Sequence, residues 1–193
     1  MNKLESESRL KQRQLLIISA AKNCFSRSGF HGASMADISR ESGLGVGQLY
    51  RYFDSKELLV NESIKSISQR WRLFLKNSFS QPFSTKEIIN TQSDFWHDWS
   101  SQDRCLLLEM YSEASRNPSV QDLLAQEEQL LITELETIFQ QKMPELSPQQ
   151  RSNRIQFLLI LVDGVACLAF GDENVDQQEL ARLNSILTRH LFS

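Results

Sequence analysis

The chain has 193 residues, 40% of them hydrophobic, with only 7 Gly and 4 Pro, and this composition predicts a globular protein that is helical throughout. The formal net charge of −3 hides a split: residues 1–58 hold 9 Lys and Arg against 6 Asp and Glu, a net of +3, and residues 59–193 hold 12 against 18, a net of −6. The longest apolar run, residues 157–170, is interrupted by Asp163 and Gly164 and is shorter than the roughly 20 residues of a membrane-spanning helix, so we expect a soluble, cytoplasmic protein.

The first predicted helix runs from about residue 9 to residue 28. Its apolar residues share one face: Leu10, Ile17, Ala21, Cys24 and Phe25. Three cations, Arg9, Lys11 and Arg13, stand near its start, where the helix dipole disfavours positive charge. A contact with phosphate and a solvated charge cluster are both compatible with this arrangement.

A second, short helix is predicted from Ser34 to about Ser42. Ser34 and Asp37 have the spacing of a capping box, in which each residue satisfies a free backbone N–H of the other. Met35 and Ile38 form the inward stripe, and Gly43 can adopt the positive φ that ends a helix. Two helices separated by such a turn predict a helix-turn-helix.

The third predicted helix opens at Gly45 or Val46. Its inward residues recur at three- and four-residue spacing: Val46, Leu49, Tyr50 and Phe53. Its outward residues are Gly47, Gln48, Arg51 and Tyr52. Gln pairs with adenine edges, Arg with guanine or phosphate, and Tyr hydroxyls with phosphate, so this face suits a major groove. Lys56 follows the N-cap residues Asp54 and Ser55, and a phosphate docked at that helix start would offset its unfavourable position.

These residues carry a resemblance to a known family. The matching motifs are Gly29-Phe30, Ser34-Met35-x-x-Ile38-Ser39, Ser42-Gly43-Leu44, Gly47-x-Leu49-Tyr50-x-Tyr52-Phe53 and Ser55-Lys56-Glu57-x-Leu59. They closely resemble the DNA-binding domain of TetR-family transcriptional regulators. The resemblance implies that the helix after the turn reads the major groove and that Tyr50, Tyr52 and Lys56 contact phosphates. The full set of candidate DNA-binding residues is Ser34, Gly45, Gly47, Gln48, Tyr50, Arg51, Tyr52 and Lys56.

Two positions depart from the family pattern. Gly45 stands where many members have Ser, which removes a side-chain cap and a phosphate contact, and Ala36 stands where a basic residue is frequent. Base reading is therefore expected to depend on Gln48, Arg51 and the backbone around Gly47.

The rest of the chain predicts further helices, about nine in all. Their expected ranges are 55–77, 84–100, 103–116, 118–142, 147–170 and 176–192, with capping boxes at Ser84-x-x-Glu87 and Ser147-Pro148-x-Gln150. We expect an all-α protein with a DNA-binding domain at residues 9–57 and a helical regulatory domain at residues 58–193, joined by the long helix that begins at Ser55.

The last two helices are candidates for a dimer interface. The 147–170 helix is apolar on more than one face, so a second face must be buried, either in a dimer or in a monomer core. TetR-like regulators also dimerise through their last helices. The candidate interface residues are Phe157, Leu161, Val165, Leu168, Leu183 and Leu187.

Aromatic residues concentrate between residues 71 and 111. TetR-like proteins commonly bind a small effector in the helical body, so this belt is a candidate pocket, although such a stripe also suits a plain core. The candidate effector residues are Trp71, Phe74, Phe95, Trp96, Trp99, Met110 and Tyr111. An effector that binds one arrangement of the reading helices better would shift DNA affinity through the helix from Ser55.

The remaining patterns argue against catalysis and metal binding. Cys24, Cys105 and Cys167 are far apart in apolar contexts and are interpreted as small buried hydrophobic residues. No metal-binding spacing, phosphate loop or G-x-S-x-G occurs, and the three histidines are scattered, so no cofactor, metal or catalytic residue is expected. The predicted function is a homodimeric repressor that a small molecule releases from a palindromic DNA operator. The alternative is a helical protein-protein adaptor without sequence-specific DNA binding.

Overall fold

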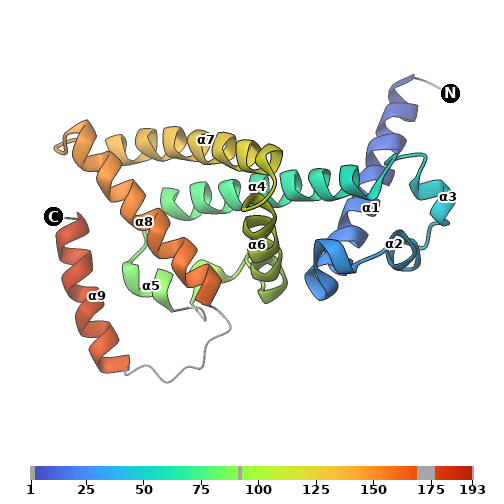
Figure 1. The fold of residues 1–193 in the computed structure, drawn as a ribbon. Helices are drawn as coiled ribbons and strands as arrows, with labels where there is room; N and C mark the ends of the chain where they lie inside the picture. Colours follow the sequence, from blue (N-terminus) through green and yellow to red (C-terminus); the bar gives the residue numbers. More distant parts are fainter. Residues whose placement is uncertain (1–2, 91–92, 169–176, 193) are drawn as a thin grey trace. The chain divides into compact units, whose positions relative to one another are not determined.

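A computed structural model describes residues 3–90, 93–168 and 177–192, and within those ranges all regular secondary structure is helical (Figure 1), which confirms the predicted all-α class. The helices are α1 (Lys3–Gly32), α2 (Met35–Ser42), α3 (Val46–Leu49), α4 (Lys56–Ser80), α5 (Thr85–Ile89), the 3₁₀ helix η1 (Asp94–Trp96), α6 (Ser101–Ala114), α7 (Pro118–Lys142), α8 (Pro148–Leu168) and α9 (Gln177–Phe192). None of the described helices is both long and apolar enough to cross a membrane.

The chain divides into two compact units. Unit 1 comprises residues 1–69 and 105–123, and unit 2 comprises residues 70–104 and 124–193. Helices α4, α6 and α7 contribute residues to both units. The predicted functional boundary near residue 57 stays a prediction.

Unit 1 is built on the apolar face of α1, which packs on α2. Ile17, Ala21 and Phe25 have no exposed surface, and Phe25 meets Phe30 edge to face with ring centroids 5.1 Å apart. Leu10 was expected on this face, but it is 52% exposed, because it lies before the first buried position of α1. The buried face of α1 therefore begins at Ile17, about four turns after the helix starts at Lys3.

Unit 2 contains a helix that is shorter than predicted. The capping box of Ser84 and Glu87 is present and opens α5, but α5 ends at Ile89 instead of continuing to residue 100. Two carbonyls near its end accept hydrogen bonds from side chains. Ser93 Oγ donates to Glu87 O at 2.5 Å, and Trp96 Nε1 donates to Ile88 O at 2.7 Å. These bonds satisfy the helix end and turn the chain into η1.

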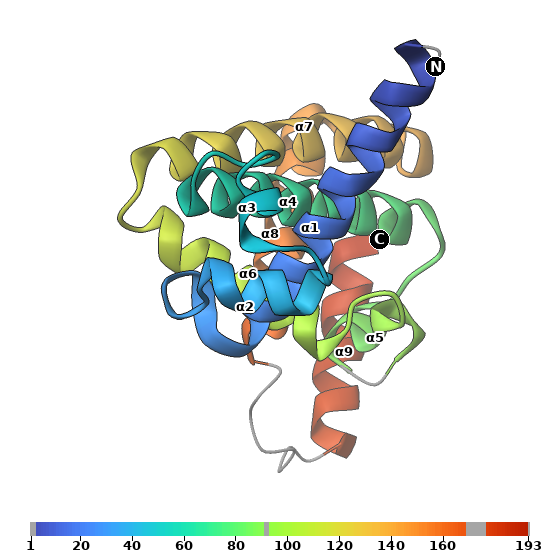
Figure 2. The same cartoon turned by 90° about the vertical axis from the view of Figure 1, so that its right-hand side faces the viewer.

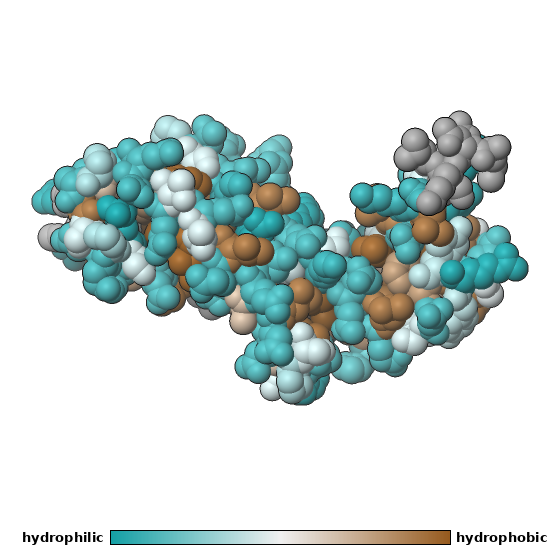
Figure 3. Space-filling view, turned by 90° about the horizontal axis from the view of Figure 1, so that it is seen from above, coloured by the Kyte–Doolittle hydropathy of each residue, from teal (hydrophilic) through white to brown (hydrophobic). Residues whose placement is uncertain are grey.

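Ion pairs between α4 and α7 stabilise unit 2. Arg72 donates to Glu127 and to Glu134 at 2.8 Å each, and Lys76 donates to Glu134 at 2.9 Å. Arg72 is largely buried, so the pairs are partly shielded from solvent. Seen from the side on which α7 lies (Figure 3), unit 2 presents mostly hydrophilic residues with separate hydrophobic clusters.

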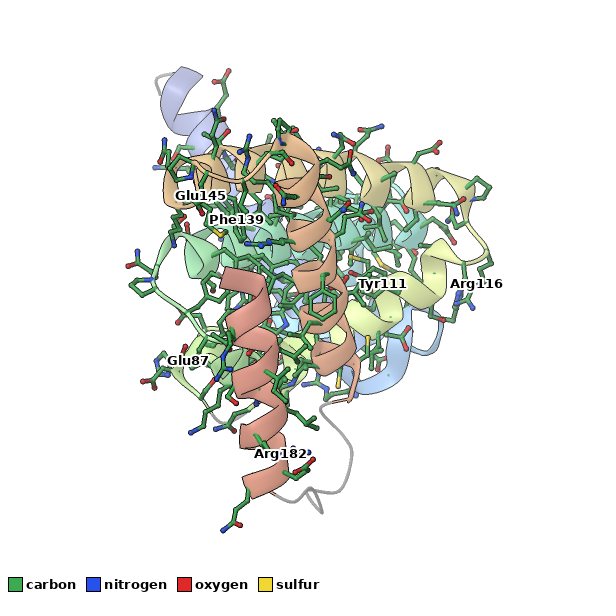
Figure 4. The ribbon with its side chains drawn as sticks, turned by 90° about the vertical axis from the view of Figure 1, so that its left-hand side faces the viewer. Glu87, Tyr111, Arg116, Phe139, Glu145 and Arg182 are labelled. Carbon is green, nitrogen blue, oxygen red and sulfur yellow. The ribbon has the colours of Figure 1, made fainter. Side chains whose placement is uncertain are left out.

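Helix α8 is apolar on two faces, as predicted. One face is buried in unit 2 and consists of Ile155, Leu158, Leu159, Val162 and Ala166. The other carries Phe157 at 40% exposure and Ile160 at 69%. Both α8 and α9 pack on α5, and Figure 4 views unit 2 from the side on which these two helices lie in front. The exposed apolar surface of α8 and α9 is thus unpartnered in the single chain.

Candidate nucleic-acid interface

Helices α2 and α3 form the predicted helix-turn-helix (Figure 2). The Asp37 backbone N–H donates to Ser34 Oγ at 3.2 Å and the Ser34 backbone N–H donates to Asp37 Oδ2 at 2.9 Å, which is the predicted capping box. Hydrogen bonds from Ser34, together with the Arg40 guanidinium, hold the pKa of Asp37 below its ordinary value. Gly43 ends α2 with φ 68°, the left-handed conformation predicted for it.

Helix α3 is only four residues long, and its inward residues differ from the prediction. Leu49 is fully buried and Phe53 is nearly so, as expected. Val46 and Tyr50, which were also expected inward, are 39% and 46% exposed. Val46 is the first residue of α3, and Tyr50 is the residue at which the regular helix ends. After Tyr50 the backbone tightens, because the Arg51 and Tyr52 N–H groups donate to carbonyls three residues back, so the regular helical stripe does not continue there.

Gln48 is held in a defined conformation. The Gly45 backbone N–H donates to Gln48 Oε1 at 3.1 Å, so the side chain of Gln48 closes the start of the helix that Gly45 cannot cap. Gly47 lies on the exposed side of α3, and a Cβ there would meet no neighbour within 4 Å. The exposed surface of α3 is therefore unobstructed at Gly47 and carries the amide of Gln48.

Lys56 opens α4 as predicted, and the Leu58 backbone N–H donates to Ser55 Oγ at 3.1 Å, so Ser55 caps the helix. The Lys56 ammonium donates to the backbone carbonyl of His31 at 2.9 Å. In the free chain this bond connects the start of α4 to the last turn of α1, which follows the kink at Gly29.

Two carboxylates of α6, which the sequence analysis did not single out, hold that same turn. The Phe30 backbone N–H donates to Glu109 Oε2 at 3.2 Å. His31 Nε2 lies 3.2 Å from Glu113 Oε2. Burial raises the pKa of Glu113, but hydrogen bonds from Asn117, His31 and Arg116 outweigh it and hold the pKa below its ordinary value. These partners are about 80 residues apart in sequence, so no local motif could have predicted the contact.

The candidate effector residues fall into two groups. Trp71, Phe74, Phe95, Trp96 and Trp99 form one aromatic cluster in unit 2, in which the Trp71 and Trp99 ring centroids are 4.8 Å apart. The three tryptophans are buried, and Phe74 and Phe95 also line a hollow of about 320 Å³. Met110 and Tyr111 belong to unit 1, where Met110 is buried and Tyr111 is 37% exposed (Figure 4).

The candidate dimer residues lie on the outward sides of α8 and α9. Phe157 and Leu183 are exposed, and Leu161, Val165 and Leu187 are half-buried; the side chain of Leu168 lies outside the described part of the chain. The cysteine interpretation was right for Cys24, which is buried, and wrong for Cys167, which is exposed on α8 because it lies off the face that packs into unit 2.

Comparisons with known proteins agree with this geometry. Residues 17–62 match the family described as bacterial regulatory proteins, tetR family. The chain is 31% identical to the HTH-type transcriptional regulator UidR of Escherichia coli K12 over 108 residues, 56% of this chain and 55% of that protein. It is also 31% identical to the HTH-type transcriptional regulator RutR of the same organism over 121 residues, 61% of this chain and 56% of that protein.

The fold is similar to solved structures over nearly its whole length. Salmonella enterica GusR matches with a TM-score of 0.71 and 25% identity, covering 94% of this chain and 95% of that one. The chain spans little more than half the length of UidR and RutR, 55% and 56% respectively. Both of these relatives are HTH-type transcriptional regulators.

Proposed function

We propose that the chain belongs to the tetR family of bacterial regulatory proteins and is a sequence-specific DNA-binding transcriptional regulator. The observation that supports this most is the exposed surface of α3 with the Gln48 amide on it, which follows a capped α2 and a left-handed glycine turn. Such a surface inserts its side chains into a major groove. A protein that acts on bacterial DNA works in the cytoplasm, and this location is part of the proposal.

The proposed roles divide between base reading and backbone contact. Gln48 reads a base, because its amide can present a donor and an acceptor to an adenine edge. Tyr50 and Lys56 contact phosphates, where Tyr50 offers an exposed hydroxyl and Lys56 an ammonium at a helix start. Ser34, Gly45 and Tyr52 lie at the edges of the helix-turn-helix and add to this contact with the DNA backbone.

The active species is proposed to be a homodimer. Its interface would bury the outward apolar face of α8 and α9, whose most exposed member is Ile160 at 69%. Exposed apolar patches of this kind mark interaction sites in soluble proteins. Two-fold symmetry then predicts a palindromic operator with half-sites on the order of 34 to 36 Å apart or a multiple of this distance.

We further propose that the protein is a repressor and that a small effector releases it. The hollow beside Phe74 and Phe95 is the proposed effector site, because it combines aromatic walls with the polar side chains of Asn77, Glu87 and Asp98. Compounds that lower the operator affinity of the wild type should lose that effect in Phe95→Ala. Equal responses of wild type and variant would place the effector elsewhere.

The function is tested by selecting random duplex DNA with the purified protein at two salt concentrations. We expect an enriched palindrome. Lys56→Ala should weaken binding to every sequence and reduce the slope of log affinity against log salt by about 0.9, whereas Gln48→Ala should change the enriched base. The matched control Lys65→Ala removes the same charge from an exposed position of α4 and should change neither. Binding without a salt slope or an enriched sequence would favour the adaptor alternative.

A further inference from the structure

A small hollow lies between α1 and the reading helix. Arg13 of α1, Leu44 of the turn, Gln48 of α3, and Arg51 and Tyr52 just after α3 line it, and its volume is about 150 Å³. We call it the Arg13 hollow. Its lining contains two guanidinium groups, an amide and a phenol but no carboxylate, so its polar groups are mostly donors and its charge is positive.

The two arginines differ from the others in the same unit. Arg27 pairs with Glu41, Arg40 with Asp37 and Arg116 with Glu113. The side chains of Arg13 and Arg51, by contrast, make no hydrogen bond or ion pair with any residue in the described ranges, and both residues are exposed.

Two guanidinium groups around one hollow repel each other unless an anion lies between them. Each guanidinium remains charged at any physiological pH and presents several N–H donors in a planar fork that matches phosphate oxygens. The electrostatics of the hollow therefore favour an oxyanion, and its volume accommodates a phosphate group.

We propose that the Arg13 hollow binds one backbone phosphate of the duplex, next to the bases that Gln48 reads. Arg13 and Arg51 donate to the same phosphate, and the Tyr52 hydroxyl completes the site. This rests on the proposed function, which places α3 in the major groove, and it assigns Arg51 to the DNA backbone instead of a base edge. Arg13 thereby makes α1 part of the interface and fixes the register of α3 on the duplex.

The test measures the affinity of the full-length protein for its most enriched duplex across a salt series, by fluorescence anisotropy. Arg13→Gln and Arg51→Gln should each weaken binding roughly ten- to a hundredfold, the range for hydrogen bonds to a charged group, and should flatten the salt slope. Both variants should select the wild-type sequence. Because both side chains hold one phosphate, the double variant should lose less than the product of the two single losses.

The control is Lys65→Gln, which removes one positive charge from an exposed position of α4 in the same unit and should leave affinity and slope unchanged. Thermal melts should match the wild type for all variants, because neither arginine side chain makes an intramolecular bond within the described residues.

Two results would overturn the inference while leaving the proposed function intact. One is an Arg13→Gln variant that binds DNA like the wild type. The other is an Arg51→Gln variant that selects a different base at a fixed position, which would make Arg51 a base reader. A wild-type protein with no salt-dependent DNA binding would overturn the proposed function itself, and the inference with it.

Discussion

Replacing Gly29 with alanine should be one of the more destabilising single changes in unit 1. Gly29 has φ 70° and ψ 169°, a conformation that is essentially restricted to glycine and costs about 1 to 3 kcal/mol for other residues. A Cβ built there would lie 3.0 Å from Glu109 Oε1 and 3.1 Å from Glu109 Oε2. The carboxylate would have to move, and this would weaken the bond that it accepts from the Phe30 N–H, worth about 1 kcal/mol. The expected loss of unfolding free energy is therefore about 2 to 4 kcal/mol.

Urea denaturation at one fixed protein concentration measures this loss, since the stability of a dimer depends on concentration. In a Glu109→Ala background the steric part disappears, so Gly29→Ala should cost about 1 kcal/mol less than in the wild type. Gly43→Ala is the matched control, because Gly43 also has a positive φ of 68° but no atom within 4 Å of a built Cβ. If Gly29→Ala costs no more than Gly43→Ala and shows no coupling to Glu109, the reasoning about the carboxylate is refuted.

Two further predictions concern acid stability and assembly. Glu113 has a folded-state pKa below its ordinary 4.5, so its stabilising contribution is present above about pH 4.5 and is lost as the pH falls through the folded pKa. Glu113→Gln should therefore flatten the decline of unfolding free energy between about pH 5 and pH 3, measured by urea titrations at each pH, and a decline as steep as in the wild type would contradict this. Ile160→Asp should shift the protein from dimer to monomer in sedimentation velocity. The control Leu130→Asp changes a 52% exposed position of α7 and should leave a dimer. If both variants stay dimeric, the α8 interface is wrong.

The elements that the sequence predicted well are those fixed by residues three or four positions apart. The capping boxes that begin at Ser34, Ser84 and Ser147 all form, because each needs only a hydroxyl and a carboxylate or amide three residues later. Gly43 likewise ends α2 because glycine adopts a positive φ without steric strain. Local chemistry of this kind is visible in sequence.

The features that sequence reasoning missed depend on partners that the chain brings together from a distance or on competing side chains. Helix α5 ends where the Trp96 indole N–H donates to the carbonyl of Ile88, eight residues earlier. Helix periodicity in the sequence cannot predict this hydrogen bond. His31 is one of the three histidines that appear scattered in the sequence, and it contacts Glu113, 82 residues later. Tyr50 was placed inward because a regular α-helix was assumed to continue past the point where α3 ends.

If Gln48 reads a base as proposed, its hydrogen bond from the Gly45 N–H is the interaction with which every base contact competes. In the free protein the Gln48 oxygen is already accepting a backbone N–H, so reaching a base edge exchanges one hydrogen bond for another. With a poorly matched base, the hydrogen bond from the Gly45 N–H is more favourable than a contact with the base, so Gln48 keeps its conformation in the free protein. Recognition by such a residue yields little affinity and high discrimination, and most of the binding strength must then come from the cations around it.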